Sequence, residues 1–125
     1  MERKKAALIV GHGSRSQEAV AQFNQVVDRV RLNAVFSVVM GAHMELAEPD
    51  IPTVIKELAD AATTDIVVVP YFLFMGNHIK KDIPDILNEQ RLLYPHITFK
   101  LGNPIGFEPL VADILIKRAT EAANQ

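Results

Sequence analysis

Four short apolar runs, each followed by a stretch in which apolar residues recur at helical spacing, constrain the fold of this chain most. The runs cover residues 6–10, 35–40, 66–69 and 98–101. Short apolar and β-branched runs bounded by glycine or proline are typical of buried strands in a parallel sheet. Strands that alternate with helices need right-handed crossovers, which place the helices on both faces of the sheet. The sequence therefore predicts an α/β fold with a four-stranded parallel sheet and helices on both faces.

The segments between and after these runs predict four helices. A three-and-four spacing of apolar residues indicates helices over 16–32, 51–62 and 108–122, and Asp50 is a suitable cap for the second of them. Asp82 and Pro84 predict a further helix that starts at residue 82 and ends before Tyr94 and Pro95. The expected buried face of the last helix consists of Leu110, Val111, Ile114, Leu115 and Ala119.

Length and composition limit the classes of protein. A chain of 125 residues with 49% hydrophobic and 22% charged residues has the size and composition of one globular domain, which we place at 1–125. The formal net charge of -2 predicts no nucleic-acid partner. There is no cysteine, so a metal would have to be bound by imidazole or oxygen. The apolar run 6–10 is too short for a signal peptide or a membrane span, and we expect a cytoplasmic protein with no membrane partner.

Two histidines follow predicted strands at matching positions. His12 comes just after the run 6–10, and His78 closes the loop that follows the run 66–69. Ligands of open parallel sheets bind outside the carboxyl ends of the strands, so both side chains should reach one crevice. Glu45 and Glu48 follow the second strand at the same edge. A mixed set of imidazoles and carboxylates suits Co, Ni, Fe or Zn better than Mg or Ca.

Other interpretations of the first loop fit its residues less well. A dinucleotide fingerprint would have a third glycine where Ser16 stands, and neither a GxxxxGK motif nor a GxSxG motif around Ser14 is present. A histidine phosphatase would carry arginine directly before the histidine, whereas Gly11 precedes His12. Taken alone, His12 is equally consistent with a hydrogen-bonded loop histidine, and the glutamates with solvated carboxylates.

The loop 71–75 is unusually apolar, since loops normally run over the surface and are polar. It predicts either a wall for a large flat apolar ligand or a subunit interface, and core packing explains alternate residues only. His43 and His96 have no partner at a matching position, and we expect both on the surface.

Four motifs occur together in one order: HGSR at 12–15, ExxEP at 45–49, PxFLxxGxH at 70–78 and DIP at 82–84. In this combination the chain resembles the short form of the CbiX-type chelatases, which include sirohydrochlorin cobaltochelatases and related nickel and iron chelatases. The resemblance extends over residues 6–109. It implies that His12 and His78 are catalytic and contact the metal, with Glu45 as a less secure third ligand. It also implies that the tetrapyrrole is contacted by Glu48, Leu73, Phe74, Met75, Gly76 and Asn77.

The activity that the resemblance implies is insertion of a divalent metal into sirohydrochlorin, in cobalamin or modified tetrapyrrole biosynthesis. The metal is then a substrate, Co²⁺ first and Ni²⁺ or Fe²⁺ as alternatives, and no prosthetic group is expected. A neutral imidazole can bind such a metal and accept a pyrrole proton. A homodimer is implied, since long family members contain two copies of the domain. Two rival hypotheses are a metal or tetrapyrrole carrier without turnover, and an unrelated α/β hydrolase that uses His12 and Ser14.

Overall fold

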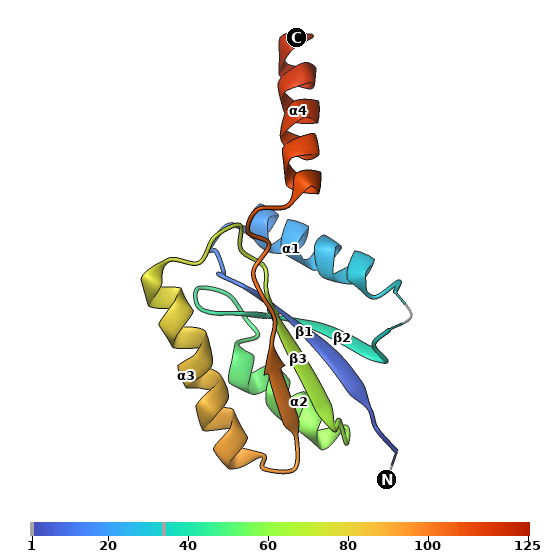
Figure 1. Cartoon of the computed structure of the whole chain (residues 1–125), viewed down its shortest axis with the longest axis vertical. Coiled ribbons are helices and arrows are strands. Elements are labelled where there is room, and N and C mark those ends of the chain that lie inside the picture. Colours follow the sequence, from blue (N-terminus) through green and yellow to red (C-terminus); the bar gives the residue numbers. More distant parts are fainter. Residues whose placement is uncertain (1, 34) are drawn as a thin grey trace.

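A computed structural model describes residues 2–33 and 35–125 and contains strands and helices in strict alternation. In chain order they are β1 (Lys5–Gly11), α1 (Gln17–Val30), β2 (Val38–His43), α2 (Ile51–Asp60), β3 (Asp65–Pro70), α3 (Asn77–Leu93), β4 (Thr98–Leu101) and α4 (Pro109–Ala123). The four strands form one parallel sheet in the order β2-β1-β3-β4 (Figure 1). The predicted α/β class and four-stranded parallel sheet are confirmed.

The core lies on both faces of the sheet, because successive side chains of a strand point to opposite sides. Leu8 and Val10 of β1 pack in the cluster that also buries side chains of α2 and α3. Ala7 and Ile9 of the same strand pack with Phe23 and Val27 of α1 on the other face. The short apolar run of β1 is therefore buried on both sides, as a central parallel strand requires.

The first helix begins one residue after its predicted start at residue 16, and the second begins directly after its predicted cap, Asp50. The Ser16 hydroxyl accepts a hydrogen bond from the backbone N–H of Ala19 at the start of α1. An Asp50 carboxylate oxygen accepts one from the backbone N–H of Thr53 at 2.9 Å. Hydrogen bonding to the Thr53 side chain, and then to its backbone N–H, lowers the pKa of Asp50 because it stabilises the ionised form.

Two predicted element starts are wrong, and the second strand also ends at His43 rather than at residue 40. β2 begins at Val38 rather than at residue 35, because the Asn33 side-chain oxygen accepts hydrogen bonds from the backbone N–H groups of Val35 and Phe36 and forms a turn there. α3 begins at Asn77 rather than at residue 82, and Pro84 lies inside it. The backbone N–H of Lys80 already bonds to the carbonyl of residue 76 at 3.0 Å, so the first helical turn forms before the proline.

α4 is confirmed as a helix, but its predicted buried face is wrong. Within the part of the chain that the structure describes, no side chain of α4 is buried, and the helix stands away from the sheet (Figure 1). The loop before it is held at the carboxyl edge of the sheet, where the backbone N–H of Ile105 bonds to the carbonyl of Phe72 at 2.9 Å. Among the helices of residues 2–33 and 35–125, none combines the length and hydrophobicity that crossing a membrane requires.

Candidate functional site

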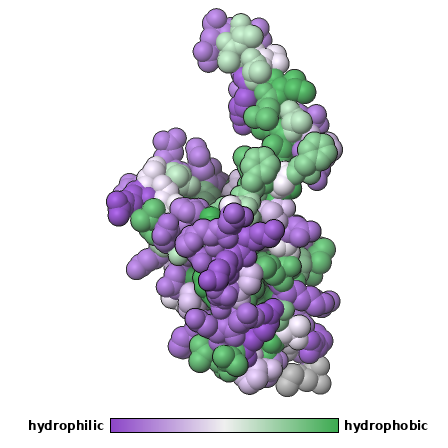
Figure 2. All heavy atoms as spheres, turned by 60° about the vertical axis from the view of Figure 1, so that its left-hand side comes forward, coloured by the Kyte–Doolittle hydropathy of each residue, from purple (hydrophilic) through white to green (hydrophobic). Residues whose placement is uncertain are grey.

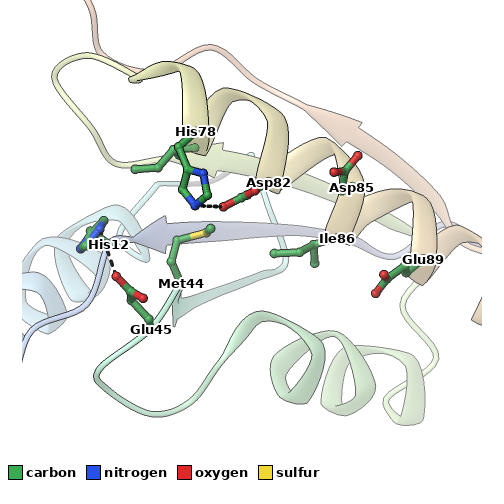
Figure 3. A pocket seen from close by; sticks show the side chains of 9 residues that line it. His12, Met44, Glu45, His78, Asp82, Asp85, Ile86 and Glu89 are labelled. Atoms are coloured by element: carbon green, nitrogen blue, oxygen red, sulfur yellow. Dashed lines mark ion pairs between the residues drawn. The ribbon is translucent and has the colours of Figure 1, made fainter.

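A pocket of about 290 Å³ lies at the carboxyl edge of the sheet, between α3 and the loops after β1 and β2 (Figure 3). The predicted residues His12, Glu45 and His78 all line it, although they come from three separate segments. The remaining lining residues are Met44, Ile79, Asp82, Asp85, Ile86 and Glu89. The structure thus brings together the two histidines and one of the two glutamates that follow β2.

Backbone hydrogen bonds hold the loop after β1 against the loop after β2. The carbonyl of Gly11 accepts from the N–H of Met44 at 2.9 Å, and the carbonyl of His12 accepts from the N–H of Glu45 at 3.1 Å. Gly13 has a φ of 98°, and a Cβ there would lie 1.6 Å from the Glu45 carbonyl oxygen. Only glycine therefore permits this approach, which places the side chains of His12 and Glu45 side by side.

The two histidines each face a carboxylate. His12 Nε2 lies 3.5 Å from Glu45 Oε1, and His78 Nε2 lies 2.9 Å from Asp82 Oδ2, one helical turn further along α3 (Figure 3). Phe72 contacts the His12 ring edge-on, with 6.3 Å between the ring centroids. A carboxylate beside one ring nitrogen helps to orient the imidazole. The other ring nitrogen of His12, Nδ1, lies 3.5 Å from the Gly13 carbonyl oxygen.

Asp82, Asp85 and Glu89 are pocket residues that the sequence analysis did not assign to the site. With His78 they follow the helical spacing of one face of α3, and Figure 3 shows them along the same side of the helix. The spacing would have indicated them if the helix had been predicted from residue 77. The predicted helix start at residue 82 placed His78 in a loop, and the prediction therefore missed its pairing with Asp82 on one helix.

The three predicted metal ligands do not form one compact cluster. Among residues 2–33 and 35–125, no three histidine, aspartate or glutamate side chains lie close enough together to hold a metal ion. His12 with Glu45, and His78 with Asp82, instead form two pairs on the walls of one pocket (Figure 3). Both imidazoles are exposed to solvent.

The residues predicted to contact a tetrapyrrole lie outside this pocket. Glu48, Gly76 and Asn77 are exposed, and Leu73 and Phe74 expose 51% and 77% of their surface. Within the apolar loop, Phe72 and Met75 pack against the core, and Tyr71 stacks on the buried ring of Phe23 with 6.1 Å between the ring centroids. The loop 71–75 therefore presents apolar side chains to the surface rather than burying all of them.

The expectation that His43 lies on the surface is wrong, whereas His96 is exposed as predicted. β2 extends to His43, which is only 3% exposed and packs against Phe23 with ring centroids 4.8 Å apart. Burial lowers the pKa of His43, because it penalises the charged imidazolium. Its Nδ1 has no hydrogen-bond partner among the described residues.

The fold and the pocket together define an open α/β domain with two histidine-bearing segments at the carboxyl edge of its sheet. Comparison with known proteins agrees with this description. The CbiX family model matches residues 6–122, and the chain therefore belongs to the CbiX family. The resemblance inferred from the four sequence motifs is confirmed.

Individual relatives differ in the metal that their names state. The chain is 34% identical to a sirohydrochlorin cobaltochelatase of Methanosarcina barkeri, over 98% of this chain and 99% of that protein. It is 31% identical to a sirohydrochlorin ferrochelatase of Priestia megaterium, over 93% of this chain and 44% of the relative. The crystal structure of the sirohydrochlorin chelatase SirB from Bacillus subtilis subspecies spizizenii, in complex with cobalt, superposes with a TM-score of 0.89 at 31% identity. That match covers 94% of this chain and 50% of the SirB chain, so this chain spans about half the length of two of these relatives.

Proposed function

We propose that this protein is a chelatase that inserts a divalent metal ion into sirohydrochlorin, in cobalamin or modified tetrapyrrole biosynthesis. The supporting observation is one pocket at the carboxyl edge, lined by His12, Glu45 and His78, in a chain of the CbiX family. Relatives named for cobalt and for iron are both similar to this chain. Co²⁺ is our first candidate for the substrate metal, with Ni²⁺ or Fe²⁺ as alternatives, because these ions share ligand preferences.

The proposed mechanism follows from what insertion requires. The metal ion replaces two pyrrole protons, so it must be held while it loses water, and each proton needs an acceptor. A neutral imidazole binds borderline metals and accepts protons near neutral pH. We assign His12 as the principal base and metal ligand and His78 as its partner on the opposite wall. Glu45 then supplies a further oxygen ligand beside His12, 3.5 Å away.

Binding of the macrocycle is assigned to the surface beside the pocket. The exposed side chains of Leu73 and Phe74 offer an apolar surface for a flat ring. The full set proposed to contact the tetrapyrrole is Glu48, Leu73, Phe74, Met75, Gly76 and Asn77. A pocket of about 290 Å³ is at the lower limit of about 300 Å³ for small-molecule sites. We therefore propose that each chain is one domain and that a homodimer encloses the macrocycle between two such domains.

A side-by-side insertion assay tests this function. Sirohydrochlorin is mixed with excess Co²⁺, Ni²⁺ or Fe²⁺ at neutral pH without oxygen, and the change in its visible absorption is followed with and without catalytic amounts of protein. We expect many turnovers per chain with at least one metal and a rate well above the reaction without protein. Binding of metal or sirohydrochlorin in stoichiometric amounts without turnover would instead identify a carrier. Absence of any binding of sirohydrochlorin would contradict both functions.

A further inference from the structure

A second cavity lies at the amino edge of the sheet, opposite the edge that carries His12. Its volume is about 740 Å³, within the range of about 300–1,000 Å³ that is typical of small-molecule sites. Residues just before each of the four strands line it, among them Lys4 before β1, Ser37 before β2, Thr64 before β3 and His96 before β4. This cavity, which we call the amino-edge groove, therefore extends across the whole amino edge of the sheet.

The amino-edge groove is separate from the pocket that His12 lines. β1 runs from Lys5 to Gly11, and a strand of this length spans about 23 Å. Lys4 lines the groove at one end of β1, and His12 lines its pocket at the other. In Figure 1 the N-terminus and α4 accordingly lie at opposite ends of the molecule. A small molecule in the groove does not reach His12 of the same chain, so the groove requires a ligand of its own.

Thr63 brings to the groove a hydroxyl that the fold leaves without a partner. The residue is only 2% exposed, and its Oγ1 has no hydrogen-bond partner among the described residues. Its backbone N–H bonds to the carbonyl of Leu58 at 3.0 Å, directly after Ala62 with a φ of 64°, so the turn after α2 fixes Thr63 in place. Buried polar atoms of native proteins nearly always have a partner. The hydroxyl therefore points to a hydrogen-bonding group on a bound molecule.

The ionisable side chains of the groove are mainly nitrogen donors. Among the described residues that line it, Arg3, Lys4 and His96 are bases and Glu2 is the only acid. Arg3 Nη2 lies 2.5 Å from Asp65 Oδ1, and this ion pair orients the guanidinium while leaving other N–H donors free. Lys4 Nζ donates to a main-chain carbonyl at the end of α2 at 2.8 Å and keeps further donors. Such donors suit the oxygens of an anion.

Apolar atoms lie between these donors. The methyl groups of Ala62, Thr63 and Thr64 belong to residues that line the groove. In Figure 2, hydrophilic and apolar side chains both lie at the end of the molecule opposite α4. An inorganic ion alone would fill only a small part of a cavity of about 740 Å³, which favours an anion that carries an organic body.

We propose that the amino-edge groove binds a small organic anion, a carboxylate or a phosphate on an apolar body. The anionic oxygens contact the donors of Arg3 and Lys4, and the Thr63 hydroxyl donates to the bound molecule. The apolar body lies along the threonine and alanine methyl groups. The inference does not depend on the proposed function, because binding at this edge is measured without metal or tetrapyrrole.

An NMR titration of the ¹⁵N-labelled chain tests this site. The probes are benzoate and phenyl phosphate, with benzamide as the uncharged control of similar shape. We expect saturable shifts of the Lys4 and Thr64 amides with at least one anion, no shift at His12, and binding of benzamide at least about 10-fold weaker. The anion that binds more tightly distinguishes carboxylate from phosphate. Equal affinity for benzamide, shifts confined to His12 and His78, or no saturable shift with either anion would overturn the proposal.

Arg3→Gln removes the charge that the proposal places beside the anion. Arg118→Gln is the matched control, since Arg118 forms a comparable ion pair with Glu121 at 2.8 Å on α4, outside the groove. We expect the dissociation constant of the tighter anion to rise at least about 10-fold for Arg3→Gln and to stay within about 2-fold for the control. Circular dichroism checks that both variants are folded. Equal dissociation constants for the two variants would contradict the proposal.

Thr63→Val separates a ligand-binding hydroxyl from a merely structural one. Valine has nearly the same shape and buries no unpartnered oxygen, so the melting temperature without probe should rise by about 4 °C. A structural role predicts this rise alone. The proposal predicts in addition that the dissociation constant of the tighter anion rises about 5-fold or more, because the bound molecule loses a donor. An unchanged dissociation constant would count against the site.

Discussion

Gly13→Ala is the sharpest test of how the pocket is built. The new Cβ would lie 1.6 Å from the Glu45 carbonyl oxygen, whereas real Cβ contacts below 3.0 Å are essentially never observed. The loops that carry His12 and Glu45 must therefore separate by more than 1 Å, which loses the backbone hydrogen bond between them. A misplacement of about 1 Å at a reacting group costs about 100-fold in rate.

The expected loss of stability is modest by comparison. A side chain at positive φ costs about 1–2 kcal/mol, and φ is 98° at Gly13. The lost hydrogen bond between His12 and Glu45 adds about 0.5–1.5 kcal/mol. We expect the free energy of unfolding to fall by about 1.5–3.5 kcal/mol and cobalt insertion by about 100-fold.

Gly106→Ala is the matched control. Gly106 also has a positive φ, 58°, but the nearest atom to its added Cβ is 4.0 Å away. This variant should lose about 1–2 kcal/mol of stability through backbone strain and keep most of its insertion rate. Urea unfolding gives the stability, and the absorption change of sirohydrochlorin with saturating Co²⁺ gives the rate. An insertion rate of Gly13→Ala within about 3-fold of the control would refute the argument that this close approach positions the site.

The other predictions concern single side chains of the site and the core. His12→Ala and His78→Ala should each lower insertion at least about 100-fold and leave the circular dichroism spectrum unchanged, because both imidazoles are exposed; wild-type rates would remove both from the mechanism. Asp82→Asn should reduce activity about 10-fold to 100-fold through the lost orientation of His78, with a higher KM for the metal, and an unchanged KM and kcat would speak against that role. The pKa of His43 is lowered in the folded state, so as pH falls through about 6.5 the His43 imidazole is protonated in the unfolded chain before it is in the folded chain. The free energy of unfolding should therefore decline below this pH, by at most about 1.4 kcal/mol per pH unit. His43→Leu should remove this component from unfolding curves measured between about pH 7.5 and 5, whereas parallel curves would show that His43 does not cause it.

Local patterns in the sequence were sufficient for the order of elements and for the candidate histidines. Apolar runs bounded by glycine or proline predict strands, and a cap at Asp50 predicts a helix start, because these preferences involve neighbours within a few residues. Placement of His12 and His78 after strands was enough to predict a shared pocket, since parallel strands end at the same edge.

Only the tertiary structure decided which side chains those elements bring into contact. The start of α3 at Asn77, and with it the partnership of His78 and Asp82, depends on how the chain leaves β3, which a proline signal at Pro84 does not reveal. His43 is buried because α1 packs over the end of β2, a contact between segments that periodicity cannot show. For α4 the sequence by itself determined a helix with an apolar face, since that is a local property. Where the face packs is not local: the loop held at the carboxyl edge by Gly106 directs the helix away from its own sheet.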